Sequence, residues 1–158
     1  MLQIRAVEET DRSWVMSKLT TAWGSTMMVS RGQVYDLTML PGLLAVQDTA
    51  PVGLLMYHMD GPDCEIITLN SWQEGQSIAT QLINAVQQLA LQQHCQRICL
   101  ITTNDNLAAQ RFYQRRGFVV KAVYPNALDI SRMLKPEIPL VSADGIPITD
   151  EIELEKTL

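Results

Sequence analysis

The first 70 residues are patterned as short apolar runs separated by polar turns. Residues 2–7 alternate between apolar and polar side chains, which predicts a first strand. The apolar runs 42–47 and 52–58 flank Asp48-Thr-Ala-Pro51, whose turn-forming residues predict an antiparallel hairpin. Residues 64–69 predict a third strand of the same meander. An antiparallel sheet therefore makes up much of this half of the chain.

Two segments of this half lack strand alternation. A moderately amphipathic helix is predicted over residues 9–22, built on Trp14, Val15, Leu19 and Ala22. Segment 24–40 is less regular, and its mixture of apolar and polar side chains suits the lining of an acceptor pocket and an irregular second helix equally well.

Helical spacing returns in the second half. A long helix is predicted by apolar residues that recur three or four positions apart, namely Ile78, Leu82, Ile83, Val86, Leu89 and Ala90. A nearly continuous apolar strand follows at 97–101. The order strand, helix, strand, helix and strand from 64 to 124 predicts an α/β centre behind the antiparallel N-terminal half.

The composition is that of a globular domain. At 158 residues, 47% of them hydrophobic, the chain is long enough for a sizeable core. No internal repeat or low-complexity tract interrupts it, so we expect a single domain over 1–158. The net charge of −5 and the pI near 4.9 argue against nucleic acid as a main partner and mildly favour cationic or amine ligands.

Cysteine usage and hydropathy indicate the compartment. The three cysteines, Cys64, Cys95 and Cys99, are odd in number and lie within apolar stretches, so they predict neither a disulfide framework nor a metal site. The first residues lack a basic segment followed by an apolar run, and no apolar run approaches the roughly 20 residues of a membrane span. We therefore expect a soluble, cytoplasmic protein with no membrane partner.

The most informative stretch for function is 104–118. Within it Asn106, Ala109 and Tyr113 recur at i, i+3 and i+7, so on a helix they share one face, with a small residue between two polar ones. Such a face admits a ligand. Gly117 ends the helix, and an apolar strand follows directly.

The pattern Asn-x-x-Ala-x-x-x-Tyr-x-x-x-Gly-Phe resembles the fourth helix and following strand of the GNAT superfamily of N-acetyltransferases. The resemblance implies an α/β fold with a mixed central sheet of about seven strands flanked by helices. It also implies transfer of an acetyl group from acetyl-CoA to a primary amine by direct attack, without a covalent enzyme intermediate.

The resemblance assigns roles to three residues of this motif. Asn106 contacts the pantetheine arm of the cofactor, Tyr113 protonates the departing thiolate, and Ala109 lies between them. The residues alone allow another interpretation, in which Asn106 caps a helix, Ala109 packs and Tyr113 is half-buried at a core edge. Their joint spacing favours the catalytic interpretation.

The loop before the long helix corresponds to the family's pyrophosphate-binding loop, where backbone N–H groups at a helix start bind an anion. The resemblance therefore implies cofactor contacts by Glu74, Gly75, Gln76, Ser77, Ile78, Ala79 and Thr80. Glu74 stands where the family has Gln or Arg, and Ser77 stands where it has its first Gly. Both departures weaken the expected affinity for acetyl-CoA.

The strand before this loop carries the other expected site residues. Backbone groups of Leu69 and Ser71 are expected to pair with pantetheine, and an amide near Leu69 to polarise the thioester carbonyl. Glu65 is the candidate base for the amine proton, with His58 on the adjacent strand as the runner-up. The alternative for Glu65 is a side chain that faces solvent.

The departures in the loop leave a rival function open. The chain could be a catalytically inactive CoA-binding or regulatory module of the same fold, or an enzyme that uses a longer acyl-CoA. The acceptor is equally open, because a small-molecule amine, a peptide N-terminus and a lysine side chain all suit the pattern. A homodimer is compatible with the sequence.

The C-terminal residues predict one more strand. Glu151-Ile-Glu-Leu-Glu155 alternates strictly, which predicts a strand near 150–157 that in the family completes the sheet beside the preceding strand. The proline-rich segment 125–149 is then an insertion that carries a short helix near 127–134. The three glutamates either favour a cationic acceptor or mark a solvated sheet face.

Overall fold

The polypeptide alternates between strands and helices much as its hydrophobic pattern predicts. The computed structural model describes residues 1–73 and 77–158. Its strands are β1 (Leu2–Ala6), β2 (Met27–Ser30), β3 (Gln33–Asp36), β4 (Gly42–Gln47), β5 (Ala50–Asp60), β6 (Asp63–Ser71), β7 (Arg97–Thr103), β8 (Val119–Tyr124) and β9 (Glu151–Thr157). Its helices are α1 (Arg12–Trp23), α2 (Ile78–Gln92), α3 (Leu107–Gln114) and α4 (Ala127–Leu134), with short 3-10 turns η1 (Glu9–Asp11) and η2 (Leu37–Met39).

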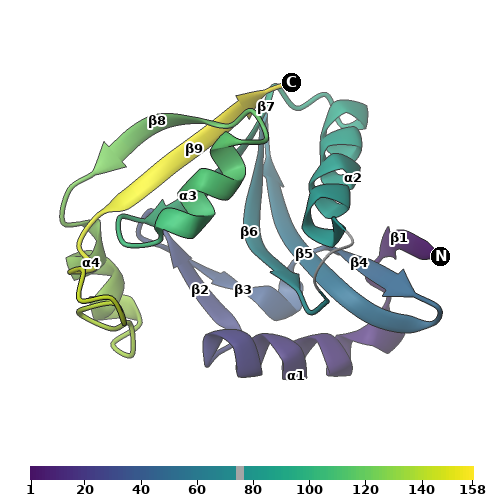
Figure 1. The fold of residues 1–158 in the computed structure, drawn as a ribbon, viewed down its shortest axis with the longest axis horizontal. Coiled ribbons are helices and arrows are strands. Elements are labelled where there is room, and N and C mark those ends of the chain that lie inside the picture. The colour runs from purple at the N-terminus through teal and green to yellow at the C-terminus, as the bar shows by residue number, and fades with distance from the viewer. Residues whose placement is uncertain (74–76) are drawn as a thin grey trace. The chain divides into compact units, whose positions relative to one another are not determined.

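Seven strands form one mixed sheet in the order β1-β4-β5-β6-β7-β9-β8, and β2 and β3 form a separate hairpin (Figure 1). This sheet confirms the predicted mixed α/β architecture. The chain divides into two compact units, one with residues 1–28, 36–98 and 158, and the other with residues 29–35 and 99–157. A single domain over the whole chain stays a prediction.

The meander of the first unit pairs antiparallel throughout, β1 with β4, β4 with β5, and β5 with β6. The turn between β4 and β5 needs only Asp48 and Thr49, whose φ angles of 48° and 73° are those of a tight hairpin turn. Ala50 and Pro51 therefore belong to β5 and not to the turn. The predicted hairpin and third strand are otherwise confirmed.

A one-residue bulge interrupts the pairing of β5 with β6. Met56 lies opposite Thr68, but the next residue of β5, Tyr57, lies opposite Ile66. Ile67 is therefore the extra residue of β6. Because side chains alternate between the two faces of a strand, an extra residue reverses the alternation beyond it.

The bulge brings two buried polar residues of β6 to the same face. Glu65 lies opposite His58, and Thr68 lies opposite Met56. His58 and Met56 are two positions apart on β5 and share a face, so Glu65 and Thr68 share that face as well. In an uninterrupted strand, residues three positions apart would point to opposite faces.

The two faces of the meander carry different helices (Figure 1). Gly53 of β5 faces α2, where a Cβ at this position would lie 2.5 Å from the Ile78 side chain and 3.1 Å from Leu82, so only glycine allows this approach. The next residue along β5 pairs with Asn70, on the other face. There the Trp23 indole at the end of α1 donates a hydrogen bond to the Asn70 side-chain oxygen at 3.3 Å. α1 therefore lies on the face of the two buried polar residues.

The core of the first unit lies between these helices and the meander. Its fully buried side chains include Leu19, Leu37, Leu44, Leu54, Leu55, Met56, Ile78, Leu82 and Ile83. Removing each such aliphatic side chain from water stabilises the fold by about 1.5–3 kcal/mol. The three that come from α2 are residues whose helical spacing predicts that helix, and the helix is confirmed.

The second unit contains the elements predicted for the C-terminal half. α3 is followed by Gly117 in a left-handed conformation with φ of 92°, and β8 pairs antiparallel with β9. In Figure 1, β9, coloured yellow, lies beside β8. The short helix over 127–134 and a last strand near 150–157 are both confirmed, as α4 and β9.

Two expectations for the N-terminal half are wrong. Segment 24–40 holds the hairpin of β2 and β3 followed by η2, and not an irregular second helix. Arg31 and Gly32 at its tip have φ angles of 52° and 73°, so a two-residue turn joins the strands. The helix predicted over 9–22 exists as α1, but Ala22 on it is exposed and does not help to build its buried face.

An ion pair before α1 makes stability depend on pH. The Arg5 guanidinium donates hydrogen bonds of 2.7 and 3.0 Å to the Asp11 carboxylate, and these lower the pKa of Asp11 to about 2. Asp11 therefore holds its proton less tightly in the folded protein than in the unfolded chain. Its contribution to stability is complete above about pH 4 and is lost as the pH falls towards 2.

We expect Asp11→Asn to lower the free energy of unfolding by about 1 kcal/mol near neutral pH, because it removes the charge pair with Arg5, which is partly exposed to solvent. Urea unfolding of both proteins across the acid range measures the difference. The gap between them should narrow from about pH 4 downwards. A gap that stays constant down to about pH 2 would contradict this assignment.

Candidate active site

Tyr113 lies in the interior of the second unit. Its side chain is 8% exposed, and its ring packs edge-to-face against Phe112 and Phe118 at centroid distances of 5.2 and 5.4 Å. Its hydroxyl makes no hydrogen bond to any described residue. Burial raises the pKa of this hydroxyl, and the charge of Arg116 offsets only part of the effect. The phenol therefore keeps its proton at neutral pH and is suited to donate it.

Asn106 is the N-cap of α3. Its side-chain oxygen accepts a hydrogen bond from the Ala109 backbone N–H at 3.1 Å, so the helix-cap interpretation is correct. The cap uses only the carbonyl end of the amide, and the side chain is exposed. Its NH₂ group remains available to a ligand, so a cap and a cofactor contact are compatible in one residue. Ala109 is half-buried beside it in the sequence of α3.

The guanidinium group of Arg116 stabilises the C-terminal end of α3. The Arg116 guanidinium stacks over the Phe112 ring at 3.5 Å and donates a hydrogen bond to the Phe112 carbonyl at 2.8 Å. Positive charge at a helix C-terminus is favourable because the last carbonyls carry partial negative charge. Arg116 thereby fixes the helix turn that carries Tyr113.

Glu65 is only 3% exposed, so the alternative of a solvent-facing side chain is wrong. It lies directly opposite His58, which places the two candidate bases side by side on one face of the sheet. Thr68 shares this face and is also 3% exposed. Sequence reasoning missed Thr68, because only the bulge turns it towards this side.

Leu69 and Ser71 lie near the end of β6. Leu69 is half-buried opposite Leu55, and Ser71 is exposed opposite Gly53. The Ser71 hydroxyl donates a hydrogen bond to the Gln73 carbonyl at 3.0 Å and so orders the chain after the strand. Pairing of their backbone groups with a ligand stays a prediction.

The N-terminus of α2 begins at Ser77, whose backbone is left-handed with φ of 53° and ψ of 32°. Its side chain caps no backbone N–H group of the helix. The first-turn amides of a helix have no intrahelical partner and carry partial positive charge, which suits an anion. Ile78 is buried at 2% exposure, and Ala79 and Thr80 are half-buried.

The other residues expected in this loop, Glu74, Gly75 and Gln76, lie outside the described residues.

A buried acidic pair lies in the second unit. Glu151 and Glu153 are 3% and 2% exposed, so neither marks a solvated sheet face. The Arg31 backbone N–H donates to the Glu151 carboxylate at 3.2 Å, and the Arg31 guanidinium lies 3.9 Å from Glu153. The Tyr124 hydroxyl donates to Glu153 at 2.5 Å. Strict alternation identified these residues as one face but could not show which face is covered.

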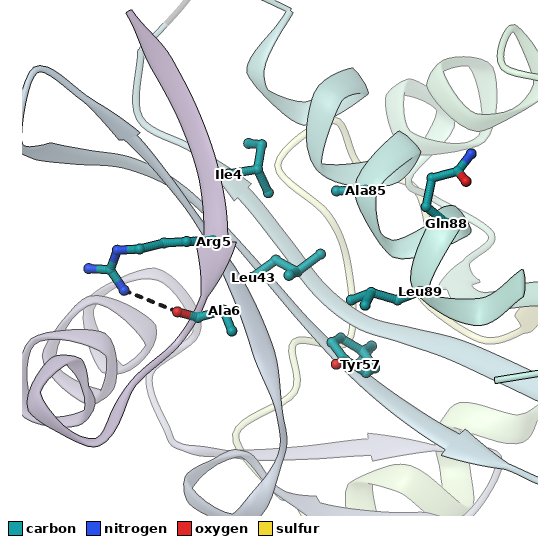
Figure 2. Close-up of a pocket in the computed structure, with 8 residues that line it drawn as sticks. All are labelled: Ile4, Arg5, Ala6, Leu43, Tyr57, Ala85, Gln88 and Leu89. Atoms are coloured by element: carbon teal, nitrogen blue, oxygen red, sulfur yellow. Dashed lines mark hydrogen bonds between the residues drawn. The ribbon is translucent and has the colours of Figure 1, made fainter. Parts of the chain in front are cut away.

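A pocket of about 380 Å³ opens in the first unit between β1, β4, β5 and α2 (Figure 2). Its lining residues are mostly apolar and comprise Ile4, Arg5, Ala6, Leu43, Tyr57, Ala85, Gln88 and Leu89. Leu43 and Tyr57 point to the face of the meander that α2 covers. Glu65 points to the opposite face, so this pocket is separate from the candidate base.

Cys64, Cys95 and Cys99 are buried, and none of them forms a disulfide bond with a described residue. Among residues 1–73 and 77–158, no group of three or more His, Cys, Asp or Glu side chains is placed to hold a metal ion. No helix within the described part of the chain is long and apolar enough to cross a membrane.

Comparison with known proteins establishes the family. The profile of the acetyltransferase (GNAT) family matches residues 12–118, which is more than half of the chain. The chain is 45% identical over 137 residues to the uncharacterized protein YdhI of Bacillus subtilis (strain 168), with 86% of each covered. It is 39% identical over 137 residues to the uncharacterized protein YxbD of the same strain, with 86% of each covered. The chain therefore belongs to the GNAT family of acetyltransferases.

Solved structures agree in fold. A GNAT family acetyltransferase from Elizabethkingia anophelis with acetyl-CoA bound superposes with a TM-score of 0.70 at 19% identity, covering 99% of this chain and 98% of that one. A Bacillus subtilis acetyltransferase in complex with CoA gives a TM-score of 0.70 at 16% identity, covering 100% and 99%. At these identities the likeness shows the fold alone, and it confirms the predicted architecture.

The left-handed backbone of Ser77 generates a stability prediction. A residue with a Cβ is strained in this conformation by about 1–2 kcal/mol, whereas glycine adopts it freely. Ser77→Gly should therefore raise the free energy of unfolding by about 0.5–1 kcal/mol, because the released strain exceeds the added freedom of the unfolded chain. Ser77→Ala is the matched control, since it keeps the Cβ and should bring no gain. Urea unfolding measures the free energy of unfolding of both variants. A glycine variant that is no more stable than the alanine variant would contradict the assigned backbone strain.

Proposed function

We propose that this chain is an N-acetyltransferase that moves the acetyl group of acetyl-CoA to a primary amine by direct attack. The observation that carries the proposal is Tyr113, a largely buried side chain whose hydroxyl makes no hydrogen bond to a described residue, at the tyrosine position of the family motif. A phenol that is held by ring packing, and whose hydroxyl makes no hydrogen bond to a described residue, is suited to donate to a ligand.

The groups that the chain offers suit an acyl-CoA. When bound, acetyl-CoA supplies the activated acetyl group. The first-turn amides of α2, at Ile78, Ala79 and Thr80, suit its pyrophosphate, and the exposed NH₂ group of Asn106 suits the amide carbonyls of its pantetheine arm. Backbone groups near Leu69 and Ser71 are proposed to contact the same arm.

Glu65 is proposed to accept the proton of the acceptor amine. Amines are mostly protonated at neutral pH, and only the neutral form has a lone pair with which to attack. Glu65 is buried on β6, and His58 lies directly opposite as a second group able to take a proton. Its burial largely excludes bulk water from this carboxylate.

Two donors are proposed to stabilise the charge that develops during transfer. A backbone N–H near Leu69 polarises the thioester carbonyl, and the Tyr113 hydroxyl donates to the sulfur as the carbon–sulfur bond breaks. Because burial raises the pKa of Tyr113, a lasting phenolate is disfavoured. Tyr113 is therefore best suited to a hydrogen bond that strengthens as thiolate character grows.

The acceptor, the compartment and the oligomeric state complete the proposed activity. The acceptor is a small-molecule or peptide amine, and no metal ion takes part. Three buried cysteines without a disulfide bond fit a cytoplasmic protein, where reducing conditions prevail. A homodimer is compatible with this activity.

One observation favours a second candidate function, a CoA-binding or regulatory module without catalysis. Ser77 stands in a left-handed conformation at the position where the family has glycine, so its side chain adds bulk and strain where the backbone would approach the pyrophosphate. We expect such a weakened cofactor loop in a protein that no longer catalyses acetyl transfer.

Tyr113→Phe separates the two functions. For an enzyme we expect kcat to fall by about a hundredfold, because the proton donor to sulfur is lost, with the Kd for acetyl-CoA changed by less than about twofold. Thiol release from acetyl-CoA is measured with spermidine, a lysine ester and a short peptide with a free N-terminus as acceptors.

Tyr57→Phe is the matched control, since Tyr57 lines the separate pocket on the α2 face and its change should leave turnover unaltered. A Tyr113→Phe variant as active as the parent would contradict the role of the phenol. Binding of acetyl-CoA without thiol release by the parent protein would favour the non-catalytic module.

A further inference from the structure

Thr68 carries a buried hydroxyl for which the described residues supply no hydrogen-bond partner. The residue is 3% exposed, and its Oγ1 atom is inaccessible and makes no hydrogen bond to any described residue. Ser131, 1% exposed on α4, shows the usual arrangement, because its hydroxyl donates to the Ala127 carbonyl at 3.3 Å. Valine has nearly the same shape as threonine and would fill the Thr68 position without an unsatisfied polar atom. Packing alone therefore does not explain a threonine here.

The bulge at Ile67 directs this hydroxyl to the face of the candidate base. Glu65, His58 and Thr68 all point to the side of the meander on which α1 lies. Glu65 and Thr68 are the two buried polar side chains described on β6, and they flank the bulge. Bulges commonly re-aim a side chain next to a reaction site.

We propose that Thr68 binds the acceptor amine and holds it for deprotonation by Glu65. This inference rests on the proposed acetyltransferase function. The Thr68 hydroxyl oxygen accepts a hydrogen bond from one N–H of the amine, while Glu65 takes a proton from the same nitrogen. A primary amine suits this arrangement, because after losing one proton to Glu65 it still has N–H groups to donate and a free lone pair.

The proton and bond changes balance with the groups already named. The protonated amine gives one proton to Glu65, and its lone pair forms the new carbon–nitrogen bond with the acetyl carbonyl carbon. The carbon–sulfur bond breaks, and the thiol leaves with a proton that is drawn, through Tyr113, from the nitrogen that has become an amide. Glu65 then releases its proton to solvent. Thr68 neither gains nor loses a proton, so its role is to position the nitrogen.

Thr68→Val and Thr68→Ser test the inference in the full-length chain. The valine variant removes the hydroxyl and keeps the shape, whereas the serine variant keeps the hydroxyl. We expect Thr68→Val to raise the KM for the amine by about tenfold, the equivalent of one lost hydrogen bond of about 1.4 kcal/mol, with the Kd for acetyl-CoA unchanged. Thr68→Ser should stay within about threefold of the parent. The acceptors are spermidine, a lysine ester and a short peptide with a free N-terminus.

Thermal unfolding distinguishes a structural hydroxyl from one reserved for a ligand. Thr68→Val should unfold at the same temperature as the parent or higher, whereas Ser131→Ala, which removes a partnered hydroxyl, should unfold at a lower one. A valine variant that is destabilised, or that keeps the parental KM and kcat, would overturn the inference while the acetyltransferase function stands. Absence of thiol release by the parent with every acceptor would contradict the proposed function and, with it, any acceptor for Thr68 to hold.

Discussion

The pairing of β5 with β6, and its bulge at Ile67, decides where the polar groups of the first unit lie. Before the bulge, Glu65 shares a face with His58, and after it Thr68 is returned to that same face. If Ile67 paired regularly with Met56, Thr68 would lie opposite Leu55 and point towards α2, into the apolar packing around Gly53. The bulge therefore places both buried polar residues of β6 on the face opposite α2, and this is the face that can carry acid–base chemistry.

The family assignment explains why some residues are kept although they lower the stability of the fold. Thr68 has a buried hydroxyl without a partner among the described residues, and Ser77 holds a left-handed backbone without being glycine. Each feature is unfavourable for folding on its own, by an amount that a simple substitution would remove. Their positions, on the strand of the candidate base and at the start of α2, are those at which an acyl-CoA enzyme needs free polar groups and close backbone approach.

Much of the fold could be predicted from the sequence, because strong periodicity survives in α2, α4 and β9 and because turn residues separate the strands of the meander. The family could be predicted from the spacing of Asn106, Tyr113 and the residues around them. The bulge could not, since no local signal marks Ile67 as the extra residue and only pairing with β5 reveals it. The burial of Glu153 could not be predicted from the sequence either. Alternation shows which residues share a face, but it does not show that Arg31 and Tyr124 lie against that face.

Every proposed role depends on recognition of acetyl-CoA by a loop that departs from the family pattern. Titration calorimetry of the full-length chain with acetyl-CoA, with desulfo-CoA and free CoA as controls, measures this recognition directly. An acetyltransferase should show saturable binding with a Kd on the order of micromolar, as its N-terminal amides on α2 and the Asn106 side chain engage the cofactor. No heat of binding at a cofactor concentration on the order of millimolar would contradict the assignment of this chain as an acetyl-CoA-dependent enzyme.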